Sequence, residues 1–324
     1  MINRRRLLLA ANAAALAAPL DLFAQQAGVY PDKPVRIIVA AAAGAGDDVT
    51  ARLLAAKLSE LLGQQFVVEN RPGAGGMIGQ THVAKSPPDG YTLLLAGGSM
   101  AGSHYVNANM GYDLKRDFSP ISLIETVPWG FVVSPTLPVK NVREFIALAR
   151  SRPGKMTYGT IGAGQIPYWA VRLFNSMAGI DALEVTYKGG TEVMVDVIAG
   201  RLDYYFPPLP NAITSRDKLR ILAVTSRARA DVLPDVPTLM ESGLPDYEMP
   251  AWRSLMGPAG LRREVVDTLN GAMVRALASP DLREKMIKTG AVPASSTPDE
   301  LRRRYEDWSG IFGKIAKEAG LKPQ

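Results

Sequence analysis

The stretch VRIIVAAAAGAGDDVTARLLAAKLSELLGQQFVVE, residues 35–69, decides the fold. It opens with an apolar, β-branched run at 35–40, which is typical of a buried strand. Residues 49–62 carry apolar side chains at helical spacing, and Gly63 follows them where a helix favours glycine at its end. A second β-branched run covers 66–69. A strand, a helix and a strand at this spacing predict a βαβ unit and therefore a parallel sheet.

The same alternation continues along the chain. It predicts strands over 91–96, 129–133, 156–159, 183–187 and 219–225, helices over 142–150, 167–178 and 192–199, and mostly helix from 263 onwards. The length of 324 residues fits two domains. Because strands and helices alternate without tandem repeats, the sequence predicts two α/β units.

Composition excludes several classes of protein. Hydrophobic residues make up 47% of the chain and charged residues 21%, a globular balance that excludes a disordered protein. There is no cysteine, so a disulfide framework, a Cys-ligated metal site and a thiol nucleophile are excluded. The chain has only two histidines, His82 and His104, which nearly excludes a multi-histidine metal site.

Residues 1–24 have the pattern of a signal peptide. Three arginines at 4–6 precede an apolar stretch at 7–20, and Ala24 offers a cleavage site. This stretch is shorter than the roughly 20 residues that a spanning helix needs. We therefore expect export, by either the Sec or the twin-arginine route. The mature chain keeps a net charge of +4 with dispersed basic residues, which gives no nucleic-acid signature.

Four loops are candidates for binding a ligand, at 40–48, 97–104, 160–166 and 206–210. Each follows a predicted strand, and ligands of open α/β sheets bind at the carboxyl ends of strands. In the first and third loops, small side chains leave the backbone open just before a helix, whose free N–H groups attract an anion. Two such loops would suit a ligand with two carboxylates. The alternative, that they are only tight turns, stays open.

Enzyme motifs in these loops are incomplete. A dinucleotide-binding loop would need a third glycine where Val49 stands. The 97–101 run approaches a nucleophile elbow but ends in Ala101, and no histidine follows His104. Asp47 and Asp48 could bind a metal, although capping of the next helix is the better interpretation. We therefore expect no catalysis.

Several runs of sequence carry a resemblance to a known family. They are YPDKPVR at 30–36, VVENRPGAGG at 67–76, PDGYTL at 88–93, PGKMTYGT at 153–160, YKG at 187–189, AVTS at 223–226 and LPDVPT at 233–238. In order and spacing, from about residue 29 to 323, they resemble the solute-binding proteins of tripartite tricarboxylate transporters, the Bordetella uptake gene (Bug) family.

The resemblance implies an architecture and a role. It implies a two-lobed, type II-like periplasmic binding protein, each lobe a mixed, mostly parallel sheet flanked by helices. Lobe one would comprise 28–127 and 251–324, and lobe two 128–250. The protein would be a periplasmic monomer without cofactor or catalysis, which closes on a small carboxylate and delivers it to a permease of one large and one small membrane subunit. A module of a sensing pathway, and less readily a periplasmic enzyme, are the alternatives.

The resemblance also implies site residues. Amides of the first loop would bind one carboxylate with Asp48 orienting a water, the third loop would bind the other end, and Tyr168 and Phe206 would wall the ligand. The full expected set is Ala41, Ala43, Gly44, Ala45, Gly46, Asp48, Ser103, His104, Thr160, Ala163, Gly164, Gln165, Tyr168 and Phe206.

Departures from the family pattern predict the kind of ligand. Ala40, Ala41 and Ala43 replace two prolines and an aromatic residue, and Ala45 replaces a glycine. Tyr168 stands where the family has a histidine, and it adds a ring and a phenolic hydroxyl. These changes predict a ligand bulkier than aspartate or succinate, such as the aromatic dicarboxylate terephthalate.

Overall fold

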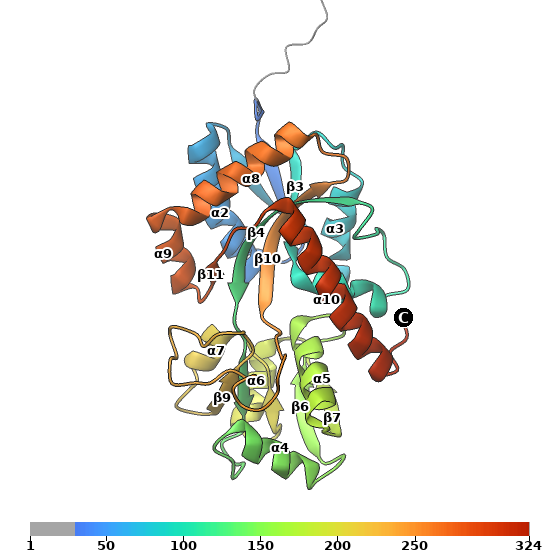
Figure 1. Cartoon of the computed structure of the whole chain (residues 1–324), viewed down its shortest axis with the longest axis vertical. Coiled ribbons are helices and arrows are strands. Elements are labelled where there is room, and N and C mark those ends of the chain that lie inside the picture. Colours follow the sequence, from blue (N-terminus) through green and yellow to red (C-terminus); the bar gives the residue numbers. More distant parts are fainter. Residues whose placement is uncertain (1–29, 324) are drawn as a thin grey trace, which may run out of the picture. The chain divides into compact units, whose positions relative to one another are not determined.

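A computed structural model describes residues 30–323, so the signal peptide predicted at 1–24 lies outside the described residues. Contacts group Lys33–Gln324 into one compact unit. This unit contains two β-sheets, each with its own helices (Figure 1).

The first sheet has six strands in the order β11-β4-β10-β3-β1-β2. They are β1 (Val35–Val39), β2 (Phe66–Asn70), β3 (Thr92–Gly97), β4 (Phe118–Val127), β10 (Ala251–Pro258) and β11 (Val292–Pro293). Strands β1, β2 and β3 pair in parallel, whereas β10 is antiparallel to both β3 and β4. A strand from late in the chain therefore lies between two early ones.

Helices of the first sheet begin and end as local chemistry dictates. They are α2 (Gly46–Leu62), η2 (Ala74–Gly76), α3 (Met77–Ala84), η3 (Gly98–Tyr105), α8 (Arg263–Ala278), α9 (Pro280–Lys288) and α10 (Pro298–Glu318). Helix α2 ends at Gly63, whose left-handed φ of 68° lets its N–H bond to the carbonyl of Ser59. Helix α10 begins with a capping box, in which Thr297 and Glu300 bond to each other's backbone N–H.

The second sheet has five strands in the order β7-β6-β8-β5-β9. They are β5 (Gly130–Val133), β6 (Met156–Thr160), β7 (Ala182–Thr186), β8 (Tyr204–Tyr205) and β9 (Arg220–Val224). Its helices are α4 (Val142–Arg150), α5 (Ile166–Ala178), α6 (Gly190–Ile198) and α7 (Leu209–Ile213). Strand β6 is parallel to β7 and β8, whereas β5 is antiparallel to β8 and β9.

The chain passes between the sheets twice, from β4 to β5 and from β9 back to β10 (Figure 1). The two passages are bonded to each other. The N–H of Thr225 donates to the carbonyl of Trp129 at 2.9 Å, and the N–H of Trp129 donates to the Thr225 hydroxyl at 3.1 Å. The N–H of Met249 also donates to the carbonyl of Thr225.

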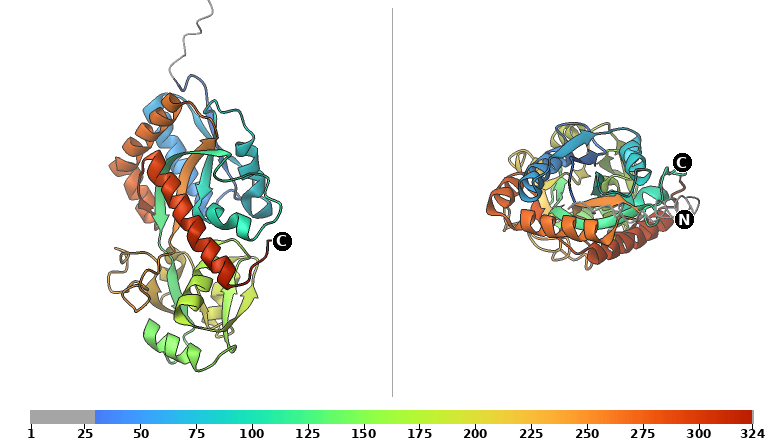
Figure 2. Two further views of the ribbon diagram at one scale, coloured as in Figure 1. Left: turned by 45° about the vertical axis from the view of Figure 1, so that its right-hand side comes forward. Right: turned by 90° about the horizontal axis from the view of Figure 1, so that it is seen from above.

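Side chains from the helices of both sheets share one apolar core. Helix α10 runs beside α5 in the views of Figures 1 and 2. There the ring of Trp169 on α5 lies 4.6 Å from the ring of Phe312 on α10. Gly102 of η3 allows this packing, because a Cβ on it would come within 3 Å of both rings.

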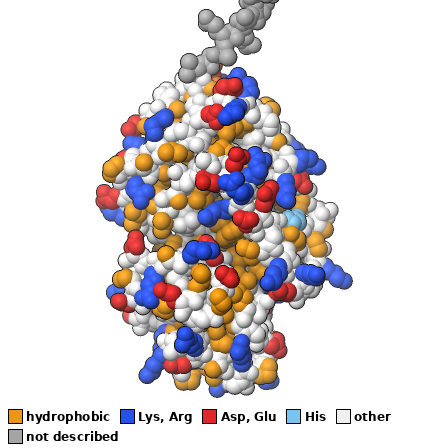
Figure 3. Space-filling view, viewed as in Figure 1, with side chains coloured by type: hydrophobic (Ala, Val, Ile, Leu, Met, Phe, Trp, Pro, Cys, Tyr) orange, Lys and Arg blue, Asp and Glu red, His pale blue; other side chains and the backbone are white. Residues whose placement is uncertain are grey.

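The expected class of fold is confirmed: each sheet is mixed and flanked by helices. Antiparallel pairing is more extensive than the alternation predicts, because β4 and β10, which the sequence analysis does not identify as strands, pair with each other inside the first sheet. None of the helices in the described part of the chain is long and apolar enough to cross a membrane. On the face in Figure 3, basic and acidic side chains are interspersed.

Candidate functional site

The first predicted loop joins β1 to α2 and leaves the start of that helix without a side-chain cap. The residue before the helix is Ala45, which has no oxygen on its side chain to accept a hydrogen bond. The backbone hydrogen bonds found in residues 30–323 do not use the N–H groups of Gly46 and Asp47. The first N–H groups of a helix have no partner within it. This loop therefore offers free donors to an anion.

Asp48 holds this loop in place. Its Oδ2 atom accepts from the N–H of Gly44 and from Nε of Arg52, both at 2.9 Å. The bond from Arg52, followed by that from Gly44, lowers the pKa of Asp48 to about 2. The carboxylate is buried, and its Oδ1 atom has no partner among the described residues. Asp48 thus stays ionised and shapes the backbone that would receive a ligand.

An arginine that the sequence analysis missed lies beside this loop. Arg253 of β10 pairs across the sheet with Gly97 and Glu125. Its Nε atom donates to Asp47 and its Nη1 atom to Glu125, in two short contacts. Thr50 of α2 donates to the same Glu125 oxygen at 2.9 Å. The start of α2 is therefore tied to two strands by one partly buried ion-pair cluster.

The burial of Glu125 makes this cluster unusual. Its side chain is 0% exposed, and burial raises its pKa although Arg253 acts in the opposite direction. Oε2 of Glu125 has no partner among the described residues. A sequence signal for the cluster exists, because Glu125 and Arg253 are charged residues in otherwise mostly apolar strands. Nothing in the local pattern says that the two strands are neighbours.

The second predicted loop forms η3, which carries its two candidate residues, Ser103 and His104. The hydroxyl of Ser103 donates to the carbonyl of Ser99 at 3.3 Å, and the carbonyl of Ser103 accepts from the Asn107 side chain. The ring of His104 lies 3.9 Å from that of Tyr105, with the two ring planes tilted by 41°. Partial burial lowers the pKa of His104.

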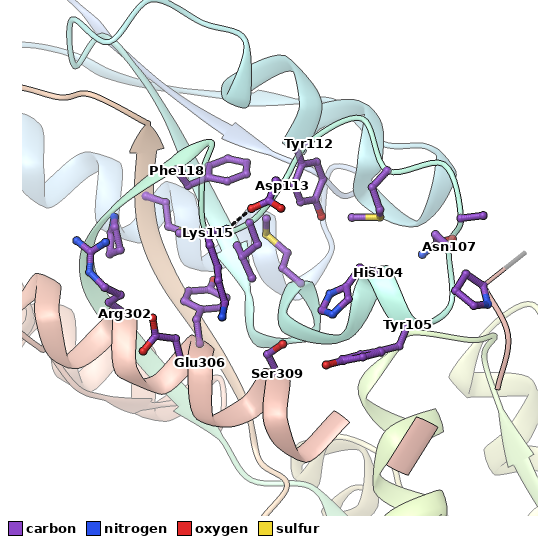
Figure 4. A pocket seen from close by; sticks show the side chains of 18 residues that line it. His104, Tyr105, Asn107, Tyr112, Asp113, Lys115, Phe118, Arg302, Glu306 and Ser309 are labelled. Carbon is purple, nitrogen blue, oxygen red and sulfur yellow. Dashed lines mark hydrogen bonds between the residues drawn. The ribbon is translucent and has the colours of Figure 1, made fainter. Parts of the chain in front are cut away.

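His104 lines a cavity of about 550 Å³ (Figure 4). The cavity lies between η3, the segment after it and one face of α10. Buried Met100, Phe118 and Met256 give it an apolar floor, and Lys115, Arg302 and Glu306 add charges of both signs. Of the fourteen predicted site residues, only His104 lines it.

The third predicted loop joins β6 to α5, beside the second sheet. Its glycine at 164 is close to the segment that follows η3, since a Cβ there would lie 3.0 Å from Val106. Ala163 is exposed, and Gln165 precedes α5 without capping it through its side chain. Thr160 is fully buried and its hydroxyl donates to Glu184 at 2.7 Å.

The two predicted aromatic walls are buried in this structure. Tyr168 is 5% exposed, with the guanidinium of Arg172 over its ring at 4.4 Å. Burial, more than any charge, raises the pKa of its hydroxyl. Phe206 is 1% exposed and stacks on Phe131 at 5.0 Å within the core that the two sheets share. Neither ring presents an open surface to a ligand as the structure stands.

The site lacks the residues of a metal centre. Within the part of the chain that the structure describes, no group of three or more histidine and carboxylate side chains could hold a metal ion. The chemistry available in the loops is hydrogen bonding and charge: amides at the start of α2, the guanidinium of Arg253 and the carboxylates around it.

Comparison with known proteins identifies the family. Residues 50–321 match the model of the tripartite tricarboxylate transporter family receptor. The chain is 37% identical, over 93% of its length and 88% of the relative's, to the UPF0065 protein in the TAR-I ttuE-ttuC' intergenic region of Agrobacterium vitis. It is 33% identical to Protein BugT of Bordetella pertussis, over 95% of this chain and 94% of that protein.

Solved structures of related proteins support the same family. R. palustris Rpa4515 with adipate is 34% identical, has a TM-score of 0.79 and is matched over 91% of this chain and 100% of that one. MatC from Rhodopseudomonas palustris with bound malate is 28% identical, with a TM-score of 0.73 and coverage of 89% and 100%. The chain therefore belongs to the tripartite tricarboxylate transporter receptor family, the Bug family of periplasmic solute-binding proteins, and is not an enzyme.

Proposed function

We propose that this protein captures a small dicarboxylate between its two lobes in the periplasm and delivers it to the two membrane subunits of a tripartite tricarboxylate transporter. In this proposal 1–24 is removed on export, lobe one is 28–127 with 251–324, lobe two is 128–250, and the protein acts as a monomer. The related structures hold adipate and malate, both dicarboxylates.

The observation that carries the proposal is the uncapped start of α2. The amides of Gly46 and Asp47 are unused by the hydrogen bonds found in the described chain, and Ala45 supplies no cap. The loop before them is made of alanine and glycine, so a carboxylate can approach the backbone closely. The predicted partner loop before α5 also lacks a side-chain cap.

The size of the ligand is the finer part of the proposal. The alanines of the first loop support a bulkier acid than succinate, and Ala42, Ala43 and Gly44 are exposed. The second support for an aromatic acid is weaker, because the ring of Tyr168 is already covered by Arg172. An aliphatic dicarboxylate of adipate's length therefore comes first, and terephthalate second.

Calorimetric titration of the purified protein tests this proposal. Adipate, succinate, malate and terephthalate are titrated beside adipamide, the neutral amide of adipate. Binding of one or more of the acids without binding of adipamide is the expected result. If no acid binds, carboxylate capture is wrong. Uptake of the bound acid by cells lacking the permease subunits would instead favour a sensing pathway.

A further inference from the structure

Arg253 has one nitrogen left for a ligand. Two of its three side-chain nitrogens are used, Nε by Asp47 and Nη1 by Glu125. Nη2 makes no hydrogen bond to any described residue, and it is absent from the set of sealed, unpartnered polar atoms. The side chain is 18% exposed. The guanidinium is thus held through Nε and Nη1, while Nη2 keeps some exposure to solvent.

The open nitrogen lies against the first residue of α2. A Cβ built on Gly46 would come within 2.9 Å of Nη2. Arg253 also lies opposite Gly97, the last residue of β3, so it stands at the carboxyl end of that strand. Ligands of α/β sheets bind at such ends. Nη2 therefore lies close to the residue that supplies the first free amide of α2.

A cation at this place is electrostatically unfavourable without anions nearby. The N-terminus of a helix carries a partial positive charge, and the guanidinium adds a full one. Asp47 and Glu125 supply the compensating carboxylates, one 39% exposed and the other fully buried. Glu125 is held from α2 by Thr50, so it keeps the guanidinium in position rather than facing a ligand.

Asp47 accepts a hydrogen bond from Nε of Arg253 but not from Nη2, so it uses only one of the two N–H groups on this edge of the guanidinium. The N–H bonds of Nε and Nη2 point in the same direction, and together they bind a carboxylate with two parallel hydrogen bonds. Asp47 takes Nε and leaves Nη2 free. Because it is the most exposed member of the cluster, it is also the one that can turn away.

We infer that the Nε–Nη2 edge of Arg253, with the amides at the start of α2, is the carboxylate subsite of this protein, and that Asp47 occupies half of it until a ligand carboxylate takes its place. This inference rests on the proposed function and makes it more specific. It places the carboxylate on a guanidinium, whereas the loop amides alone would require only backbone donors. It also assigns Glu125 as a positioning residue.

The test compares three variants in calorimetric titrations with sodium adipate and sodium succinate. Arg253→Lys keeps the charge and loses the paired N–H groups, so it should weaken binding about tenfold or more. Asp47→Asn removes the competing carboxylate and should tighten binding several-fold. Arg36→Lys is the control, because Arg36 is also hydrogen-bonded to a strand neighbour, Thr92, and ion-paired to Glu69. It should bind as the unchanged protein does.

Each outcome decides one claim. If the unchanged protein binds an acid and Arg253→Lys binds it equally well, the subsite is wrong while the proposed function stands. If Asp47→Asn weakens binding, Asp47 supports the ligand and the exchange is wrong. If the unchanged protein binds no acid, both the function and the subsite fail. Thermal melts of all variants show whether they are folded, and Glu125→Gln, which should weaken binding less than Arg253→Lys, tests the positioning role.

Discussion

Arg253 and Gly46 are in direct contact: the Nη2 atom of the arginine lies 2.9 Å from the point where a Cβ of Gly46 would be. The glycine is the first residue of α2 and the arginine belongs to β10, near the other end of the sequence. The contact explains why a small residue is needed here although Gly46 has no unusual backbone angle. The guanidinium of Arg253 occupies the space that a side chain at position 46 would need.

Gly46→Ala should therefore displace Arg253. A methyl group at 2.9 Å forces the guanidinium or the helix start to move, and such overpacking costs about 1–3 kcal/mol of stability. We expect a lower melting temperature and weaker adipate binding. Gly189→Ala is the control, since Gly189 lies directly before helix α6 and nothing lies within 4 Å of its Cβ position. Equal behaviour of the two variants would contradict the contact.

Asp48→Asn should lower stability in a way that depends on pH. Hydrogen bonds from Arg52 and Gly44 hold the pKa of Asp48 at about 2, below the 3.8 of a free aspartate. A group with a lowered pKa stabilises the fold fully above its unfolded value, and this contribution is lost as the pH falls through the folded value. The variant should melt below the unchanged protein from pH 7 to pH 4.

The difference in melting temperature should then narrow between pH 4 and pH 2, where Asp48 of the unchanged protein gains its proton. Thermal melts of both proteins across this range measure it. Asp113→Asn is not a suitable control, because Asp113 caps two backbone N–H groups. Asp307→Asn, on the exposed face of α10, should show no such trend. A constant difference down to pH 2 would argue against the lowered pKa.

The fold could be predicted as far as local pattern reaches. The βαβ unit at 35–69 is a strand, a helix ending at Gly63 and a parallel strand, as its spacing indicates. Strands β4 and β10 could not be predicted in this way. Both contain a charged residue, and β10 pairs with β3 and β4, which lie far from it in sequence. Only the tertiary fold makes them neighbours.

In the candidate site, too, local sequence features could be predicted, whereas contacts between distant segments could not. The amides of the first loop follow from a strand, small residues and a helix start, all of which are local. The Arg253 cluster joins residues from α2, β4 and β10, so no short motif reports it. Tyr168 and Phe206 could be placed after strands but not oriented, and the structure buries both rings. Their predicted contact with the ligand stays a prediction.

Gly102→Ala should destabilise the core shared by η3, α5 and α10. A Cβ at Gly102 would lie 2.6 Å from the ring of Phe312 and 2.9 Å from that of Trp169. Both rings are fully buried, so we expect a loss of about 1–3 kcal/mol in the free energy of unfolding. Gly310→Ala on α10 is the control, because nothing lies within 4 Å of its Cβ position and alanine favours a helix. Chemical denaturation measures the free energy of unfolding of both variants. It should fall for Gly102→Ala and should not fall for Gly310→Ala.

Ser309→Trp should leave adipate binding unchanged, although it obstructs the 550 Å³ cavity that His104 lines. Ser309 lines that cavity from α10. The proposed subsite lies at the start of α2, and no residue of α2 lines the cavity. Asp307→Trp, on the same helix but outside the cavity lining, controls for the bulk of tryptophan. We expect equal affinities for adipate in all three proteins by calorimetry. If Ser309→Trp alone abolishes binding, the acid is held beside His104 and Lys115 instead, and the guanidinium of Arg253 is not its subsite.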